Sequence, residues 1–456
     1  MTKVNDAIFK AYDIRGVVAT DLTDDVVICL GKALGTIALD NNISKMVVGY
    51  DGRLTSPSLA KFLIDGIMST GCDVINIGEV ATPIVYFANY ELQTYSGVMI
   101  TGSHNPPEYN GFKMVVNKET LASEKIQEIK QMIIADKFRT GQGQVERLDM
   151  AEIYLNKITE HVKLNRRVSI VVDAGNGVAG KFAPTLYRRL GCKVYELFCD
   201  VDGNFPNHHP DPSRPHNLLD LIEAVKNTDA EFGLAFDGDG DRVGIVTKEG
   251  NVVYPDRQMM IFSADILERH PGAKIIFDVK SSRLLKDWII EHGGEPIMAK
   301  TGHSLIKAKI RETGAILAGE MSGHIFFNDH WRGIDDGIYA GARLIEILSK
   351  ITSPSELLNA LPNSISTPEI NVAVAEGEQH AIMAKLSITA KFPTAQEVIT
   401  IDGLRAEYND GFGLVRASNT TPVLVLRFES DTEEGIERIK AEFRSILAPY
   451  VQKMEF

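Results

Sequence analysis

Short apolar runs rich in β-branched residues alternate along this chain with longer segments in which apolar positions follow helical spacing. The same order recurs over residues 45–78, 168–198 and 273–299. Each copy opens with an apolar run that ends in an aspartate, continues with helical spacing to a glycine, and closes with a second apolar run. The aspartates are Asp51, Asp173 and Asp278, and the glycines are Gly71, Gly191 and Gly294. This order predicts parallel strands buried on both faces, so we expect three related α/β domains.

The pattern changes after residue 365. Apolar runs at residues 370–375 and 424–428 predict strands, and residues 378–389 and 433–447 have helical spacing. These residues lack the aspartate-ended opening run, so we expect a C-terminal domain of α+β type. The predicted fold class is α/β, with three related domains on mixed or parallel sheets and a fourth α+β domain. We expect the domains at residues 1–149, 150–252, 253–365 and 366–456.

Composition narrows the class of protein. The chain has 456 residues and a formal net charge of −13, which argues against a general nucleic-acid binder because such proteins need a basic surface. Apolar runs stay short of the roughly 20 residues that span a bilayer, and the N-terminus has no apolar signal segment. The four cysteines form no CxxC pair. We therefore expect a cytoplasmic protein with no membrane or nucleic-acid partner.

Residues 237–242 read DGDGDR and carry the strongest single motif. In an extended loop the alternation would aim Asp237, Asp239 and Asp241 the same way. Three adjacent carboxylates repel one another unless a cation lies among them, and oxygen ligands favour Mg²⁺, with Mn²⁺ or Ca²⁺ possible. A calcium-binding EF-hand loop is excluded because Arg242 and Lys248 stand where it needs glycine and glutamate.

Residues 101–106 read TGSHNP and follow an apolar run predicted to be a strand. Gly102 and the Asn105–Pro106 pair predict a tight turn that would present Ser103 to a cleft, as a nucleophile requires. His104 is adjacent and could tune the serine. The alternative is a turn that only caps the neighbouring element.

Two further motifs suggest sugar and phosphate contacts. Residues 319–324 (GEMSGH) alternate Glu320, Ser322 and His324, which could hold sugar hydroxyls and carry a proton or meet a phosphate. Residues 416–422 (RASNTTP) offer a guanidinium, an amide and hydroxyls to a phosphate. The donors of this second motif are Arg416, Ser418, Asn419 and Thr420. A buried polar turn and an ordinary hairpin turn are the respective alternatives.

Residues 175–180 (GNGVAG) fit the glycine fingerprint of a dinucleotide site, and Glu196 lies about where a ribose-binding acid would. A nucleotide-binding oxidoreductase is therefore a second functional class to consider. The other two copies of the repeat lack these glycines, and a dinucleotide site would leave the remaining motifs unexplained. We disfavour it.

In this order, the motifs closely resemble those of the α-D-phosphohexomutase superfamily, from Ile8 to the loop at Arg416. TGSHNP together with GEMSGH is most similar to the bacterial phosphomannomutase/phosphoglucomutase group. Relatives acting on glucosamine phosphate usually have alanine and glutamine at the positions of Gly102 and Met321. The resemblance therefore favours neutral hexose phosphates, with phosphoglucosamine mutase as the alternative.

The resemblance implies four domains around a central cleft, with one motif from each. It implies that Ser103 is a phosphoserine and that one Mg²⁺ per chain is held by Asp237, Asp239, Asp241 and the phosphoserine. Matching positions place Tyr12, Arg15 and Lys113 near the phosphoserine, Arg242, Lys280 and His303 near the sugar phosphate, Glu320 and Ser322 at the sugar hydroxyls, and the Arg416 loop at the distal phosphate.

The resemblance also implies a reaction. Phosphoserine would give its phosphoryl group to a hexose 1-phosphate or 6-phosphate, and a hexose 1,6-bisphosphate would serve as intermediate and activator. We expect His324 or Lys113 as the base, a hinge near residues 365–368, and a monomer or weak homodimer. A phosphoserine-forming sugar phosphatase and a sugar-phosphate sensor are the alternatives.

Overall fold

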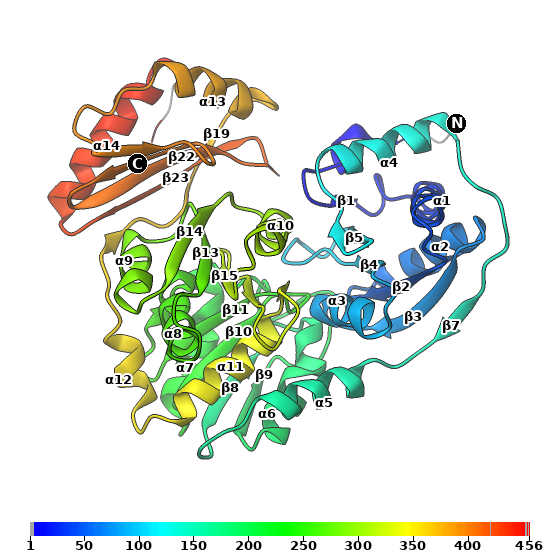
Figure 1. The fold of residues 1–456 in the computed structure, drawn as a ribbon, viewed down its shortest axis with the longest axis horizontal. Helices are drawn as coiled ribbons and strands as arrows, with labels where there is room; N and C mark the ends of the chain where they lie inside the picture. The colour runs from blue at the N-terminus through cyan, green and yellow to red at the C-terminus, as the bar shows by residue number, and fades with distance from the viewer. Residues whose placement is uncertain (1–3, 420, 452–453, 455) are drawn as a thin grey trace.

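The computed structural model describes residues 4–419, 421–451, 454 and 456, and these form four β-sheets with helices packed against them (Figure 1). The first sheet has the strand order β1-β5-β4-β2-β3-β7, with β6 beside β5. Its strands are β1 (Ile14–Val17), β2 (Lys45–Tyr50), β3 (Asp73–Glu79), β4 (Gly97–Ile100), β5 (Tyr109–Val116), β6 (Glu119–Thr120) and β7 (Val145–Arg147). The accompanying helices are η1 (Asp6–Ile8), α1 (Asp24–Asp40), α2 (Ser56–Met68), α3 (Thr82–Glu91) and α4 (Glu124–Ala135).

The second sheet has the order β12-β11-β10-β8-β9. Its strands are β8 (Ser169–Asp173), β9 (Lys193–Leu197), β10 (Phe232–Phe236), β11 (Val243–Thr247) and β12 (Val252–Val253). Its helices are α5 (Ala151–His161), η2 (Val178–Lys181), α6 (Ala183–Arg189), η3 (Pro215–Leu218) and α7 (Leu219–Asn227).

The third sheet has the order β14-β13-β15-β16-β17. Its strands are β13 (Lys274–Asp278), β14 (Glu295–Ala299), β15 (Leu317–Gly319), β16 (Ile325–Phe327) and β17 (Ile334–Asp335). Its helices are α8 (Pro255–Arg269), α9 (Arg283–Glu291), α10 (His303–Thr313), α11 (Gly337–Ser349) and α12 (Pro354–Asn359).

The first three sheets share one topology. In each, three parallel strands stand in the order third-first-second of the repeat: β4-β2-β3, β10-β8-β9 and β15-β13-β14. An antiparallel strand then returns beside the third one, as β5, β11 and β16. Gly71 and Gly191 have positive φ, as predicted for glycines after a helix. In the third copy the positive φ falls on Gly293 rather than on the predicted Gly294, because Gly293 comes first after the helix.

The C-terminal sheet is antiparallel, with the order β18-β23-β22-β21-β20 and β19 beside β23. Its strands are β18 (Ile365–Ser366), β19 (Ile370–Ala373), β20 (Glu397–Ile399), β21 (Leu404–Tyr408), β22 (Gly411–Ala417) and β23 (Val423–Ser430). Helices α13 (Glu378–Thr389) and α14 (Glu433–Leu447) lie together on one side of it (Figure 1). These residues have an apolar core of their own. The multidomain α/β fold class with a distinct α+β C-terminal part is confirmed.

A single apolar cluster joins the first three sheets. Trp331 stacks on Tyr339, with ring centroids 4.4 Å apart, and on Phe87 of α3, with centroids 5.4 Å apart. Tyr154 of α5 meets the same indole edge-on. Buried aromatic pairs of this kind add to the apolar area that they remove from water, so the sheets are held in contact. None of the helices in the described part of the chain combines the length and the apolar character needed to cross a membrane.

Candidate active site

Three predicted motifs occupy the same place in the repeated topology. TGSHNP connects β4 to β5, DGDGDR connects β10 to β11, and GEMSGH connects β15 to β16. Each loop therefore leaves the carboxyl end of the third parallel strand, the edge at which open α/β sheets form ligand sites. A backbone bridge between Arg242 and His324 joins the second and third loops directly.

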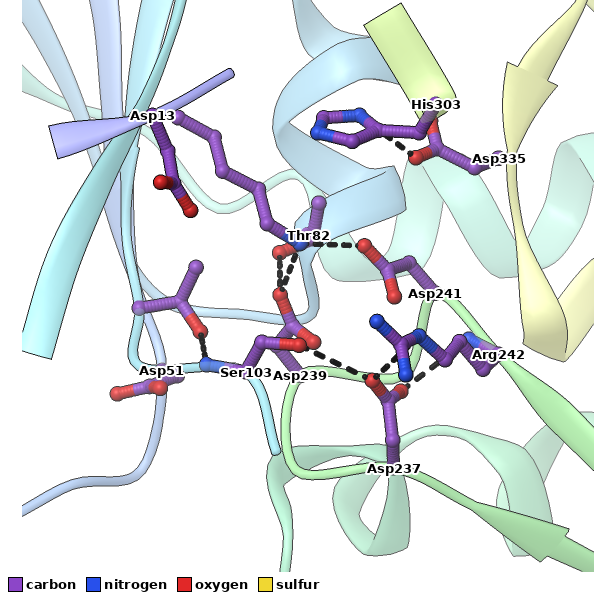
Figure 2. A network of polar contacts seen from close by, with 12 residues as sticks. Asp13, Asp51, Thr82, Ser103, Asp237, Asp239, Asp241, Arg242, His303 and Asp335 are labelled. Carbon is purple, nitrogen blue, oxygen red and sulfur yellow. Dashed lines mark hydrogen bonds and ion pairs between the residues drawn. The ribbon is translucent and has the colours of Figure 1, made fainter. Parts of the chain in front are cut away.

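The predicted nucleophile points at the aspartate loop. Ser103 Oγ lies 3.3 Å from Asp237 Oδ2 (Figure 2). It also lies 3.1 Å from His104 Nδ1. Ser103 has φ +48°, a left-handed conformation that is unfavourable for a residue with a side chain, and its N–H donates to Thr101 Oγ1 at 2.7 Å. The loop therefore holds the serine in a conformation that it would not adopt freely.

The guanidinium that holds this loop was not singled out by sequence reasoning. Arg53, 1% exposed, donates to the carbonyl oxygens of Ser103 (2.9 Å), Asn105 (2.6 Å), Pro106 (2.6 Å) and Tyr109 (3.0 Å). Asp51 faces Arg53 Nε at 3.2 Å. The only sequence signal was the position of Arg53, two residues after the first repeat's aspartate.

Two of the repeat aspartates hold functional loops as well. Asp51 Oδ2 accepts from the N–H of Gly102 at 3.3 Å, and Asp278 Oδ1 accepts from the N–H of Met321 at 3.3 Å. Both aspartates end the first strand of a repeat, and both bind the loop that leaves the adjacent third strand. In the first and third copies the recurring aspartate is thus a backbone anchor for the neighbouring loop.

The three aspartates of the second loop are fully buried, and oxygens of Asp237, Asp239 and Asp241 lie within 4.8 Å of one another. The expected extended conformation is wrong: residues 238–241 form turns, with φ +75° at Gly240. The carboxylates converge because the chain turns around them, since glycine permits this backbone. A Cβ on Gly238 would lie 2.4 Å from the Ser103 carbonyl oxygen, so the two loops are in close contact.

The electrostatics of the triad fit a cation. Burial, together with the charges of Asp241 and Asp239, raises the pKa of Asp237 well above its usual range. Lys113 offsets part of this charge by bonding Asp239 at 2.7 Å and also Asp241. Within the described chain no hydrogen bond reaches Asp239 Oδ1. Three buried oxygen ligands in one small space fit a hard divalent ion such as Mg²⁺.

The third loop places its polar groups around one imidazole. His324 Nε2 lies 3.3 Å from Asp241, and His324 Nδ1 lies 3.2 Å from Glu320 and 2.9 Å from Ser322 Oγ. Although burial opposes the charged form, Asp241 and Glu320 raise the pKa of His324 to about 9. Arg242 Nε contacts the same ring at 3.3 Å.

Tyr12 links the C-terminal loop to the rest of the site. Asn419 Nδ2 donates to the Tyr12 hydroxyl, which contacts the Thr301 carbonyl at 3.2 Å. Arg416 pairs with Asp402 at 2.9 Å, and Ser418 Oγ lies 3.0 Å from Thr421 Oγ1. Thr420, also predicted for this clamp, lies outside the described residues.

The remaining predicted residues reach the site through single contacts. Arg15 donates to Asn105 at 2.7 Å and so braces the serine loop. His303 begins α10, faces Asp335 at 3.3 Å, and has its ring centroid 5.6 Å from that of His324. Lys280 pairs with Glu369 at 3.0 Å.

These loops open into a cleft of about 1440 Å³ including its mouth. His104, Arg242, Lys280, Ser322 and Glu369 line it, so all four sheets contribute. Sequence reasoning did not single out Glu369, Asp402, Asp335 or Thr82, although Thr82 Oγ1 donates to Asp239. These residues carried no motif, and only the packing of distant elements brings Glu369 to the cleft and the other three into contact with predicted site residues.

The glycine fingerprint at residues 175–180 supports the aspartate loop instead of a dinucleotide. Val178 N donates to the Gly238 carbonyl at 3.1 Å, and a Cβ on Gly177 would lie 2.9 Å from Gly238 Cα. Glu196 pairs with Arg188 on the surface. A short 3₁₀ helix over Val178–Lys181 takes the place that a phosphate-binding helix start would need.

Comparison with known proteins identifies the architecture. Models of phosphoglucomutase/phosphomannomutase α/β/α domains I, II and III match residues 6–140, 152–250 and 254–365, and the C-terminal domain model matches residues 369–446. A phosphoglucomutase of Neisseria meningitidis is 57% identical over 98% of both chains. A phosphomannomutase/phosphoglucomutase of Pseudomonas aeruginosa is 54% identical over 97% of this chain and 95% of that one.

A crystal structure of a phosphoglucomutase/phosphomannomutase family protein from Burkholderia thailandensis has 51% identity, a TM-score of 0.94 and 99% coverage of both chains. These relatives do not favour the glucosamine-phosphate alternative. All four domain models match in sequence order, and Ser103, the three buried aspartates and the loop at residues 319–324 contact one another. The chain belongs to the phosphoglucomutase/phosphomannomutase family of hexose-phosphate mutases.

Proposed function

We propose that this enzyme interconverts hexose 1-phosphate and hexose 6-phosphate, of mannose, glucose or both, through a phosphorylated Ser103. The observation that carries the proposal is the position of Ser103 Oγ, 3.3 Å from Asp237 and 3.1 Å from His104. A hydroxyl held next to a carboxylate cluster and an imidazole has the neighbours that phosphoryl transfer requires.

Asp237, Asp239 and Asp241 would hold Mg²⁺, with an oxygen of phosphorylated Ser103 as a further ligand. When bound, the ion would neutralise charge that builds up on the transferring phosphoryl group. Lys113 and Arg242 add positive charge at the same place, since Lys113 contacts two of these aspartates and Arg242 contacts the third.

The first transfer breaks the bond between phosphorus and Ser103 Oγ and forms a bond to O6 of a hexose 1-phosphate or O1 of a hexose 6-phosphate. The attacking sugar hydroxyl loses its proton, and Oγ regains one. The resulting hexose 1,6-bisphosphate turns over in the cleft. The second transfer returns its other phosphate to Oγ and releases the isomer.

His104 is suited to exchange the serine proton. Burial and the nearby charges of Arg242 and Arg15 hold the pKa of His104 well below its usual range, so the ring is neutral near pH 7. A neutral imidazole 3.1 Å from Oγ can accept and return a proton. Lys113 and His324, the bases first expected, both have raised pKa values and would act as cations instead.

The sugar would be held mainly by donors and acceptors, because either end of it must fit. Glu320 and Ser322 would contact its hydroxyls, and Lys280, His303 and Tyr12 would contact the phosphate-bearing end. Arg416, Ser418, Asn419 and Thr420 would bind the distal phosphate. The cleft is lined from all four sheets and is open to solvent, and the intermediate would turn within it.

Closure of the C-terminal sheet over the cleft would exclude water. Arg257 holds the Pro362 carbonyl and Asn363, while β18 is already paired with β23. Arg257 also contacts Ser364 Oγ at 3.4 Å, so the hinge would lie where residue 364 meets the predicted segment 365–368. We further propose a cytoplasmic enzyme that works as a monomer or weak homodimer.

The test is Ser103→Ala, with Ser387→Ala as the control because Ser387 is an exposed helical serine on α13. We expect Ser103→Ala to lose isomerisation and to gain no phosphate, by intact mass, from a hexose 1,6-bisphosphate. Sugar-phosphate binding should persist. Near-normal turnover in Ser103→Ala would contradict the proposal. If the enzyme with the natural sequence released inorganic phosphate in place of the isomeric sugar phosphate, it would be a phosphatase.

A further inference from the structure

A second cavity lies behind the active site, between the first and third sheets. Its volume is about 560 Å³ including its mouth. One wall comes from α3, β5 and β6, and the other from α10 and residues 328–334. Figure 1 shows the hairpin of β5 and β6 reaching toward α10.

Unpaired cations surround this cavity. Lys118, Arg311 and Arg332 line it, and none of the three forms an ion pair with a described carboxylate. Lys118 Nζ lies 4.0 Å from the ring centroid of Tyr95, and the Arg332 guanidinium lies 5.9 Å from that of Tyr90. On a chain with a net charge of −13, three cations left without acidic partners around one cavity favour an anionic occupant.

Buried polar groups in the same walls also lack partners. Asn89 and Tyr86 line the cavity and are each 3% exposed. Both amide atoms of Asn89 and the hydroxyl of Tyr86 make no hydrogen bond within the described part of the chain. Buried groups of this kind are normally satisfied, so their presence indicates a ligand that supplies donors and acceptors.

We propose that this cavity is a binding site for a small phosphate ester that carries an aromatic ring. Arg311 and Arg332 would hold the phosphate, since guanidinium groups match its geometry. Tyr90 and Tyr95 would pack against the ring, and Asn89 would bond polar atoms deeper in the cavity. The site is separate from the catalytic cleft, and its lining shares no residue with that of the cleft.

Both walls connect this site to the catalytic loops. Helix α3 begins at Thr82, whose N–H donates to the Asp239 carbonyl at 2.9 Å. Helix α10 begins at His303 and carries Arg311 near its end. An occupant would therefore hold together the two helices whose first residues reach the active site, and the measurable consequence is stabilisation of the folded enzyme.

The probe is phenyl phosphate, and its binding is measured by calorimetric titration. A hexose 1,6-bisphosphate saturates the catalytic cleft during the titration. Inorganic phosphate, which lacks a ring, is titrated in a parallel experiment. The variant is Arg311→Ala combined with Arg332→Ala. Its control is Arg147→Ala combined with Arg167→Ala, two exposed arginines away from both cavities. Lys118→Ala is a second, independent variant should the double variant fold poorly.

We expect one phenyl phosphate per chain to bind in the presence of the bisphosphate, more tightly than inorganic phosphate. The double variant should weaken binding by about tenfold or more, while the control pair and the KM for hexose phosphate stay unchanged. The proposal is overturned if no phenyl phosphate binds once the cleft is saturated. It is equally overturned if Arg311→Ala/Arg332→Ala and Lys118→Ala bind it as tightly as the natural sequence does.

Discussion

Replacing Arg53 by lysine tests whether the serine loop is held by one buried guanidinium. Arg53 donates to four carbonyl oxygens and faces Asp51 at 3.2 Å. A lysine ammonium has three donors at a single point, so at least one carbonyl and the paired geometry with Asp51 are lost. At about 1.5–3 kcal/mol for each hydrogen bond to a charged group, the loss is about 3–6 kcal/mol.

We expect the serine loop to move when this stabilising free energy is lost. The left-handed conformation of Ser103 costs roughly 1–2 kcal/mol, and without Arg53 the loop can relax out of it. A displacement of about 1 Å at a reacting group can cost about 100-fold in rate, so we expect kcat to fall by about that factor. KM should change little, because Arg53 lies beneath the loop at 1% exposure.

The assay is isomerisation of a hexose 1-phosphate coupled to a dehydrogenase, with the phosphorylation level of Ser103 read by intact mass. Arg166→Lys is the matched control, since Arg166 also holds a carbonyl oxygen, that of Ile351, and a carboxylate, that of Glu231, away from the cleft. The control should lower the unfolding temperature without lowering kcat. If folded Arg53→Lys keeps kcat within about threefold of the natural enzyme, the guanidinium does not position the nucleophile.

Three further predictions concern Gly238, the proposed metal site and His208. Gly238→Ala should lower kcat by about 10- to 100-fold, because its Cβ would lie 2.4 Å from the Ser103 carbonyl oxygen; unchanged kcat would show that the loops separate freely. Chelation should abolish turnover and lower the unfolding temperature, and added Mg²⁺ should restore both, whereas Asp239→Asn should show neither response; activity that survives chelation would refute the metal site. Although burial opposes its charge, a hydrogen bond to Asp173 raises the pKa of His208 above the unfolded value of about 6.5, so the stabilisation is present below that pH and is lost as pH rises through the folded pKa. His208→Gln should therefore lower the unfolding temperature more near pH 6 than near pH 9, and a pH-independent difference would exclude the charged pair.

The sequence was most informative where one local pattern sufficed. Helical spacing gave the bounds of α13 and α14, and the aspartate-ended runs identified the opening strands β2, β8 and β13. The extended form expected for residues 237–242 was wrong because alternation in sequence predicts alternation in space only when the backbone is extended, and glycine allows the chain to turn. The candidate site residues themselves stay predictions about chemistry, even where the structure brings them together.

What the sequence could not supply was long-range contact. Arg53 binds carbonyl oxygens about 50 residues away, and carbonyl oxygens belong to every residue, so no residue type marks such a partner. The cavity behind the site could not be predicted for the same reason, since its walls come from segments separated by about 200 residues. Tyr12 and Asn419 were each predicted near phosphate, yet their mutual contact depends on where the C-terminal sheet lies relative to the first.

The repeated topology explains why the chemistry is divided among three loops. Each repeat offers one short connection at the carboxyl end of its third parallel strand, and the three connections carry the proposed nucleophile, the buried carboxylates and the proposed sugar contacts in turn. Because Asp51 and Asp278 anchor equivalent loops through equivalent N–H groups, the first and third loops are each fixed by their own sheet. Changes beneath the first or second loop should then act on transfer, and changes at Glu320 or Ser322 on sugar binding. A variant beneath the serine loop that raised KM alone would show that the first and third sheets do not support their loops independently.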